Sequence, residues 1–220
     1  MVVARSRNSF TERYEIVAGR PRALDLDTAL PVTLRLFWER GYSGQTLDQL
    51  AAALGVTKPT LCRTLGDKDA IFVAALDEYH QTYIAPAEEY LAQANTLREG
   101  LQGFFAVFVA RIVDDDLPPG CFMGDTAAAT GFDAGSIAET LQTLLGRLAS
   151  IVHQHIETAI DNGELTSTAS SLPVLQFVLG QISALSAISR SDPTQAQLDD
   201  VVEYMLNGLP WAGADSTPPG

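Results

Sequence analysis

Residues 57–68, TKPTLCRTLGDK, gather both lysines of the chain and one of its two cysteines into twelve positions. Lys58, Arg63 and Lys68 supply positive charge, and three threonines supply hydroxyl groups. Such side chains contact the phosphates and base edges of DNA in many proteins. The segment therefore indicates a nucleic-acid-binding site with Cys62 at its centre.

The distribution of charge along the chain supports this interpretation. The formal net charge is −13, which alone argues against a nucleic-acid partner. Residues 1–68, however, carry ten Lys/Arg and seven Asp/Glu, a net charge of +3, whereas residues 69–220 carry four and twenty, a net charge of −16. This asymmetry predicts a basic, DNA-facing end on an acidic body. The alternative is a chance imbalance of surface charge.

Two short helices are expected to position the basic segment. Thr46 and Gln49 in TLDQ have the spacing of a capping box, which predicts the start of one helix. Thr57 is expected to cap the next helix, with Val56 and Leu61 packing around the cap. Two short helices joined by the turn LGVT predict a helix-turn-helix, although a generic pair of antiparallel helices has similar signals.

The rest of the chain also has helical periodicity. Leu30, Leu34 and Phe37 recur on one face of an earlier helix, with Asp27 as its expected N-cap. Asp67 is expected to cap a helix through DAIFVAALDEYHQTY, and others are expected at about 96–112, 135–161, 171–189 and 195–208. No window alternates long enough for a strand. The sequence predicts an all-α fold of about nine helices.

The composition predicts four segments. Residues 1–23 form a mobile basic arm, 24–68 a helix-turn-helix domain, 69–209 a helical body and 210–220 a disordered tail. The N-terminus lacks the apolar core of a signal peptide, and the longest apolar runs have seven residues, against about 20 for a membrane span. Two cysteines provide neither a disulfide framework nor zinc spacing. We therefore expect a cytoplasmic protein with no membrane contact.

Catalytic motifs are missing from the sequence. We find no Ser/His/Asp order, glycine-rich phosphate loop or paired-carboxylate motif, so an enzyme is not expected. His153 and His155 are two residues apart on a helix and point in opposite directions, which prevents them from chelating one metal ion. No metal or cofactor is expected.

Residues 19–72, GRPRALDLDTALPVTLRLFWERGYSGQTLDQLAAALGVTKPTLCRTLGDKDAIF, resemble the N-terminal domain of the TetR family of bacterial transcriptional regulators. The helix followed by GY, the threonine that opens the second helix and the GVTKP that opens the third occur in the family's order. The resemblance implies a homodimer that binds a palindromic double-stranded DNA operator. It also implies a C-terminal ligand-binding and dimerisation domain that accepts a small, hydrophobic effector and releases the DNA, as in a repressor.

The resemblance and helical geometry together identify the DNA-binding residues. If Leu61 and Leu65 face inward, the other side of the helix faces DNA. Thr46 and Lys68 match family positions that contact the DNA backbone, and basic residues of the arm would reach the minor groove. The predicted DNA contacts are Arg20, Arg22, Thr46, Thr57, Lys58, Pro59, Thr60, Cys62, Arg63 and Lys68.

Two positions depart from the family pattern. The family commonly has tyrosine at position 62 and phenylalanine at position 65, where this chain has Cys62 and Leu65. The loss of the phenol predicts fewer phosphate contacts. A second hypothesis is therefore a helical small-molecule-binding protein with a degenerate DNA-binding head. Cys62 as a redox switch is a further alternative to an ordinary small side chain.

Two further sets of residues are predicted in the body. Aromatic and apolar side chains expected to flank an effector pocket are Tyr79, Tyr83, Phe104, Phe108, Cys121, Phe122 and Met123, with plain core packing as the alternative. The last two helices are apolar enough to form a four-helix dimer seam, for which core within one subunit is the alternative. The predicted seam residues are Leu175, Val178, Leu179, Ile182, Leu185, Leu198, Val201, Val202 and Met205.

Overall fold

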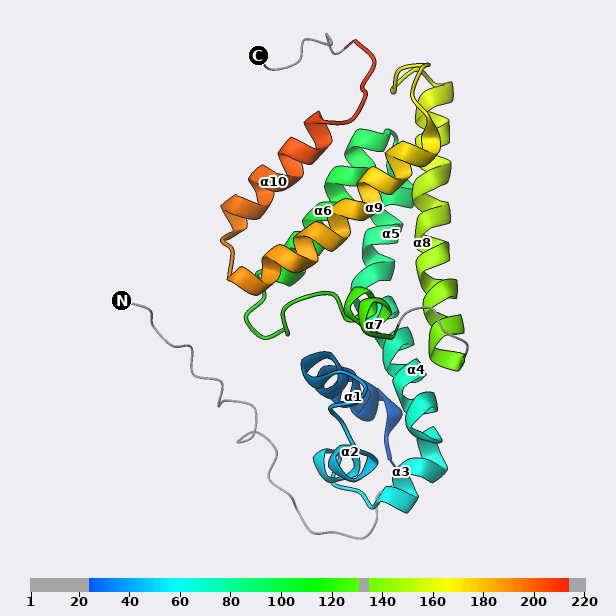
Figure 1. Ribbon diagram of the computed structural model, residues 1–220, viewed down its shortest axis with the longest axis vertical. Helices are drawn as coiled ribbons and strands as arrows, with labels where there is room; N and C mark the ends of the chain where they lie inside the picture. Colours follow the sequence, from blue (N-terminus) through cyan, green and yellow to red (C-terminus); the bar gives the residue numbers. More distant parts are fainter. Residues whose placement is uncertain (1–23, 131–134, 214–220) are drawn as a thin grey trace, which may run out of the picture.

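The computed structural model describes residues 24–130 and 135–213, in which all regular elements are helical apart from one isolated bridge between Leu165 and Trp211 (Figure 1). The predicted all-α fold is confirmed. The α-helices are α1 (Leu26–Arg40), α2 (Leu47–Ala53), α3 (Lys58–Leu65), α4 (Lys68–Tyr79), α5 (Ala85–Gln93), α6 (Leu97–Ile112), α7 (Phe122–Thr130), α8 (Ser136–Asp161), α9 (Ser171–Ile188) and α10 (Gln195–Asn207).

Helices α1, α2 and α3 form a small head at one end of the molecule (Figure 1). Phe37, Leu50 and Leu61 are completely buried and provide one core residue from each helix. The prediction of Asp27 as the N-cap of α1 is wrong. Asp25 is the cap, because its side chain accepts a hydrogen bond from the backbone N–H of Asp27 in the first turn.

Helix α4 connects the head to the body, because it packs on both α1 and α8. The ring of Phe72 on α4 lies 4.8 Å from that of Phe37 on α1, edge to face. A π-helical turn, His80–Ile84, then leads directly into α5. Head and body thus share a continuous helical connection, and the boundary predicted after residue 68 falls in the first turn of α4.

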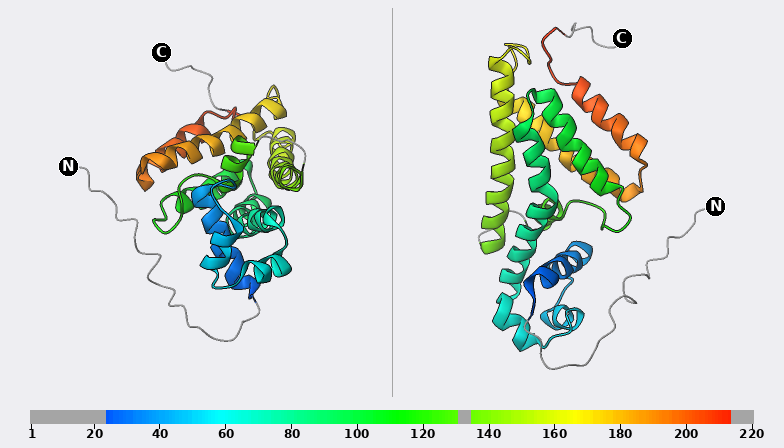
Figure 2. Two further views of the ribbon diagram at one scale, coloured as in Figure 1. Left: turned by 60° about the horizontal axis from the view of Figure 1, so that its bottom comes forward. Right: turned by 180° about the vertical axis from the view of Figure 1, so that it is seen from behind.

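Helices α5 and α7 are additional to the helices expected from the sequence. Helix α5 carries a proline in its first turn, directly after the π-helical turn. It packs on α6, while α10 covers another side of α6 and α9 packs on α8 (Figure 2). Between the helices of this body, buried Glu88 lies 3.2 Å from His80 and 3.2 Å from Arg147 on α8.

The folded body extends past residue 209, where the tail was predicted to begin. The buried indole of Trp211 donates a 2.6 Å hydrogen bond to the carbonyl of Leu206. The backbone N–H of Thr166 donates to the carbonyl of Pro210 at 2.9 Å. Residues 210 and 211 are therefore part of the fold, since these bonds and the burial of the indole hold them against the body.

Helix α9 has an unusually apolar and uncovered surface. The segment Ser171–Ser191 is long and apolar enough to cross a membrane by length and composition alone, and only 22% of its apolar 18-residue window is buried within the subunit. Leu172 and Phe177 are 59% and 40% exposed on α9, and Tyr204 is 86% exposed on α10. Large exposed apolar side chains on neighbouring elements mark a surface on which another molecule packs.

Candidate nucleic-acid interface

Both helices of the helix-turn-helix begin at the predicted caps. The Thr46 hydroxyl accepts the N–H of Gln49 at 3.2 Å, and the Gln49 side chain accepts the N–H of Thr46 at 2.9 Å, which completes the capping box. Thr57 caps α3 by accepting the N–H of Thr60 at 3.4 Å. In the turn between them, Gly55 has φ +66°, a conformation that favours glycine.

Helix α3 divides into an inner and an outer face as predicted. Leu61 is completely buried, and Leu65 is half-buried against the core. Pro59 and Arg63 are exposed, and Cys62 is half-buried on the same outer side. The smaller Leu65 thus still anchors the helix, and the head is a well-packed unit.

The lysine at the start of α3 is paired with an acidic side chain that the sequence analysis did not identify. Lys58 Nζ lies 3.0 Å from Oδ2 of Asp48, which belongs to the first turn of α2. Both side chains are exposed to solvent. The pair places one carboxylate beside the cation that is expected to meet a DNA phosphate.

Lys68, the first residue of α4, lies over the ring of Tyr42, with its Nζ 4.1 Å from the ring centroid. The Tyr42 hydroxyl donates a hydrogen bond to Asp69. This bond, together with burial and the negative charges of Asp69 and Asp67, raises the pKa of Tyr42 to about 12. Tyr42 of the GY motif therefore fixes Lys68 at the edge of the head.

The described members of the predicted DNA-binding set lie on α2, α3 and the start of α4, at one end of the molecule (Figure 1). Arg20 and Arg22 lie outside the described residues. Residues 24–68 contain five Lys/Arg and five Asp/Glu, so this segment has no net charge. The net charge of +3 carried by residues 1–68 therefore comes from residues 1–23.

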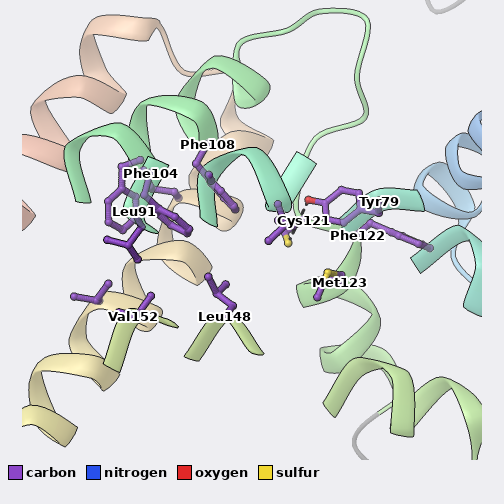
Figure 3. Close-up of a cluster of buried hydrophobic side chains, with 14 of the residues drawn as sticks. Tyr79, Leu91, Phe104, Phe108, Cys121, Phe122, Met123, Leu148 and Val152 are labelled. Carbon is purple, nitrogen blue, oxygen red and sulfur yellow. Dashed lines mark hydrogen bonds between the residues drawn. The ribbon is translucent and has the colours of Figure 1, made fainter. Parts of the chain in front are cut away.

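The predicted effector-pocket residues are core residues in this structure. Tyr79, Phe104, Phe108, Cys121, Phe122 and Met123 are all buried, and Tyr83 is half-buried. They form two groups, one around Phe104 and Phe108 and the other around Tyr79, Cys121, Phe122 and Met123 (Figure 3). Two surface hollows of about 400 and 330 Å³ lie elsewhere, one between α5, α6 and α8 and the other between α6 and α10. In this structure these side chains are packed within one continuous hydrophobic core, and their role in an effector pocket stays a prediction.

Burial raises the pKa of the Tyr79 phenol well above its usual value. Its hydroxyl donates to the Cys121 thiol at 3.4 Å. Tyr79 therefore stays protonated in the core, where it joins α4 to the segment that precedes α7.

The residues of the predicted dimer seam divide into buried and half-buried side chains. Val178, Leu185, Leu198 and Met205 point into their own subunit, because each is at most 4% exposed. Leu175, Leu179, Ile182, Val201 and Val202 are half-buried. The side chains available to a partner include Leu172, Phe177 and Tyr204, which the sequence analysis missed. One helical turn is 3.6 residues, so the choice between two adjacent apolar faces depends on how the helix is rotated against its neighbours.

In the described part of the chain, no group of three or more His, Cys, Asp or Glu side chains could hold a metal ion. His153 interacts instead with Glu157 at 3.5 Å and with the Ser171 hydroxyl at 3.0 Å.

Comparison with known proteins agrees with this geometry. The family model described as "Bacterial regulatory proteins, tetR family" matches residues 29–75, and that of the "Tetracyclin repressor-like, C-terminal domain" matches residues 98–205. The chain is 28% identical to the HTH-type transcriptional repressor ComR of Escherichia coli over 87% of this chain and 92% of that protein. It is 24% identical to the uncharacterised HTH-type regulator YezE of Bacillus subtilis over 87% of this chain and 99% of that protein.

A solved structure is similar over nearly the whole chain. A cysteine-substituted form of the TetR family transcriptional regulator CifR, complexed with 26-bp double-strand operator DNA, superposes with a TM-score of 0.75 at 26% identity. The match covers 87% of this chain and all of that one. The two family models account for the helix-turn-helix head and for most of the helical body, so the chain belongs to the TetR family of bacterial DNA-binding transcriptional regulators.

Proposed function

We propose that this protein is a homodimeric repressor that binds a palindromic DNA operator and leaves it when a small effector binds to the body. The observation that carries the proposal is the position of α3. Leu61 anchors one side of this helix in the core, while Lys58, Pro59 and Arg63 are exposed on the other side at the end of the molecule.

Helix α3 would enter the major groove with its N-terminal part closest to the DNA. Arg63 has the planar, two-pronged donor group that recognises guanine. Lys58 and Lys68 would contact phosphates, with Thr46 and Thr57 at the caps beside them. The acidic body, at −16 over residues 69–220, would be repelled by the DNA and so keep the contact confined to the head.

The second copy would cover α9 and α10. Phe177 lies near the end of α10, since a β-carbon on Gly208 would be 3.8 Å from its ring. Leu172, Phe177 and Tyr204 would then be buried by the same residues of the partner, as a two-fold interface requires. This arrangement explains why an uncharged helix remains mostly uncovered within one subunit.

A transcriptional regulator of this kind acts where DNA is, so we place it in the cytoplasm and assign it no catalytic activity. The effector is proposed to be small, with an apolar portion that packs among the aromatic clusters of the body.

Footprinting on the DNA immediately upstream of the protein's own gene tests the proposal. We expect protection of two symmetric half-sites. Their centres should be separated by a whole number of DNA helical turns, with about 34–36 Å for one turn. Raising the salt concentration should weaken the protection steeply. The absence of any protected palindrome in this region, or protection that is insensitive to salt, would contradict the proposed function.

A further inference from the structure

Arg111, in the last turn of α6, is a buried cation without a carboxylate partner among the described residues. It is 6% exposed, and its guanidinium Nη1 donates a 2.6 Å hydrogen bond to the carbonyl of Gly120. The other two nitrogens, Nε and Nη2, are buried and have no acceptor in the described part of the chain. Burying an unpaired charge is strongly unfavourable, so a chain that retains one has a use for it.

The two unpaired nitrogens are the pair that recognises carboxylates. The N–H bonds of Nε and Nη2 point in parallel from one edge of the planar guanidinium, and this spacing matches the two oxygens of a carboxylate. The contact with Gly120 occupies Nη1 and thereby holds the guanidinium in place with that edge unoccupied by protein acceptors.

Aromatic rings surround this group. The guanidinium carbon lies 4.6 Å from the ring centroid of Phe108, 5.4 Å from that of Trp38 and 6.0 Å from that of Tyr79. Ring faces stabilise a cation, but they cannot accept the hydrogen bonds that its in-plane N–H groups seek. Arg111 therefore lies close to both groups of aromatic side chains, since Phe108 belongs to one and Tyr79 to the other.

A second buried donor without an acceptor lies beside Arg111. The indole Nε1 of Trp38 is buried and has no acceptor in the described part of the chain. Trp38 comes from α1 of the head, whereas Arg111 comes from α6 of the body. Burial raises the pKa of nearby Tyr83, Asp114 raises it further, and Arg111 lowers it. Asp114 is exposed to solvent. Buried donors from two elements thus lie near one another without an acceptor in the described part of the chain.

We propose that Arg111 is the anion-recognition residue of the effector site and that the effector is a small carboxylate with an apolar or aromatic portion. This inference rests on the proposed function and specifies the chemical class of its effector. The carboxylate accepts hydrogen bonds from Nε and Nη2 of Arg111, and the apolar portion packs against Phe108 and the neighbouring rings.

The location also explains how binding reaches the DNA-binding head. Arg35, one turn before Trp38 on α1, donates a hydrogen bond to the carbonyl of Asp116 in the loop between α6 and α7. The N–H of Gly120 in that loop donates to the Ser189 hydroxyl at 2.8 Å. We expect a carboxylate bound beside Trp38 to displace α1 or this loop, because Trp38 of α1 and Gly120 of the loop both lie next to Arg111. Either displacement alters how the head sits on the body.

Trp38 provides a direct readout, since the chain has only one other tryptophan, Trp211. In full-length protein carrying Trp211→Phe, the Trp38 fluorescence would be titrated with hexanoate, benzoate and phenylacetate and with their uncharged amides, up to about 10 mM at constant ionic strength. We expect at least one carboxylate to shift the emission and to bind about tenfold more tightly than its amide. Equal responses to acid and amide, or no response to any of the three acids, would overturn the inference.

Variants separate recognition from a purely structural role. Arg111→Lys keeps the charge but loses the two-pronged edge, so carboxylate affinity should fall about tenfold, and Arg111→Met should remove the preference for the acid over the amide. Arg98→Met makes the same change of charge at the other end of α6 and should leave carboxylate binding intact. Because Arg111→Met also removes an unpaired buried charge, its melting temperature should equal or exceed that of the parent. A lower melting temperature without a change in ligand preference would assign Arg111 to the Gly120 contact alone.

The failure of this inference can be distinguished from that of the proposed function. DNA binding is measured first without ligand, where the Arg111 variants should bind the upstream site as the parent does. If the parent does not bind the upstream site, the proposed function is contradicted. If the parent binds the site but no carboxylate weakens the binding, only the assignment of Arg111 is contradicted.

Discussion

Lys58 Nζ, at the first position of α3, lies 3.0 Å from Asp48 Oδ2 in the first turn of α2. An exposed pair of this kind contributes only about 0–1 kcal/mol to folding stability. Its main consequence is electrostatic, because a carboxylate is fixed beside the cation that would meet a phosphate. The unbound head therefore presents less positive charge at α3 than the sequence TKPTLCRTLGDK suggests.

Removing this carboxylate should tighten DNA binding. Asp48→Asn keeps the size of the side chain, frees Lys58 and eliminates repulsion from the phosphates, so we expect an affinity about three- to tenfold higher. Fluorescence anisotropy with the footprinted DNA measures the change. Asp161→Asn, the same substitution at the far end of α8, is the control and should have no effect. A weaker Asp48→Asn complex would mean that Asp48 orients Lys58 toward the phosphate.

Restoring the family residue at position 62 should add a phosphate contact. Cys62 is half-buried on the outer side of α3, and a tyrosine there would extend its phenol toward the backbone of bound DNA. Cys62→Tyr should therefore bind more tightly, and the slope of log affinity against log salt should steepen by about 1. The control is Cys62→Ser, which keeps the side chain small and should match the parent. An unchanged slope in the tyrosine variant would remove position 62 from the contact surface.

Tyr42 should make the stability of the protein depend on pH in the alkaline range. Its pKa of about 12 means that the folded state holds the phenol proton more tightly than the unfolded chain, whose value is near 10. The stabilisation is complete below pH 10 and is lost as the pH rises from 10 through 12. Urea unfolding at intervals from pH 9 to 12 should show this decline in the parent, reduced in Tyr42→Phe.

Tyr90→Phe is the matched control, since Tyr90 is 60% exposed and should leave the alkaline decline unchanged. Ultraviolet titration of the folded parent should show one phenol that titrates near pH 12. The same titration of Tyr42→Phe should lack this phenol. If the two variants have the same profile, the hydrogen bond from Tyr42 to Asp69 does not persist in solution.

A charge on the uncovered face of α9 should dissociate the dimer. Phe177→Glu would bring carboxylates into an apolar two-fold interface, which should weaken dimerisation by at least about tenfold. Sedimentation analysis at micromolar concentration would detect the monomer. Leu26→Glu on α1, where Leu26 is 44% exposed, is the control and should remain dimeric. A fully dimeric Phe177→Glu protein would place the interface on another surface.

The head was predictable from sequence because its signals are local. Thr46, Gln49 and Thr57 each act within three residues along the chain, so their spacing alone identifies the starts of α2 and α3. The Lys58–Asp48 pair was not predicted, because ten residues and a turn separate its members and only the packing of α2 on α3 brings them together.

The body was less predictable because its sites depend on contacts between distant segments. Periodicity identified α9 as apolar, but the choice of Phe177 over Val178 as an exposed residue depends on the packing of α9 against α8. Arg111 was not predicted as a site residue, because a lone arginine near a helix end is usually solvated. Only the positions of Trp38, Phe108 and Gly120 around it reveal a buried cation.

The base preference of the Arg63→Ala variant at the footprinted operator tests most directly whether α3 recognises DNA sequence. Affinities of the parent and of Arg63→Ala would be compared on operators substituted at one base pair at a time. We expect the parent to discriminate by about 1–3 kcal/mol at one base pair in each half-site, and Arg63→Ala to lose discrimination at that symmetric pair only. An unchanged pattern of base preference in Arg63→Ala would contradict the assignment of α3 as the DNA recognition helix.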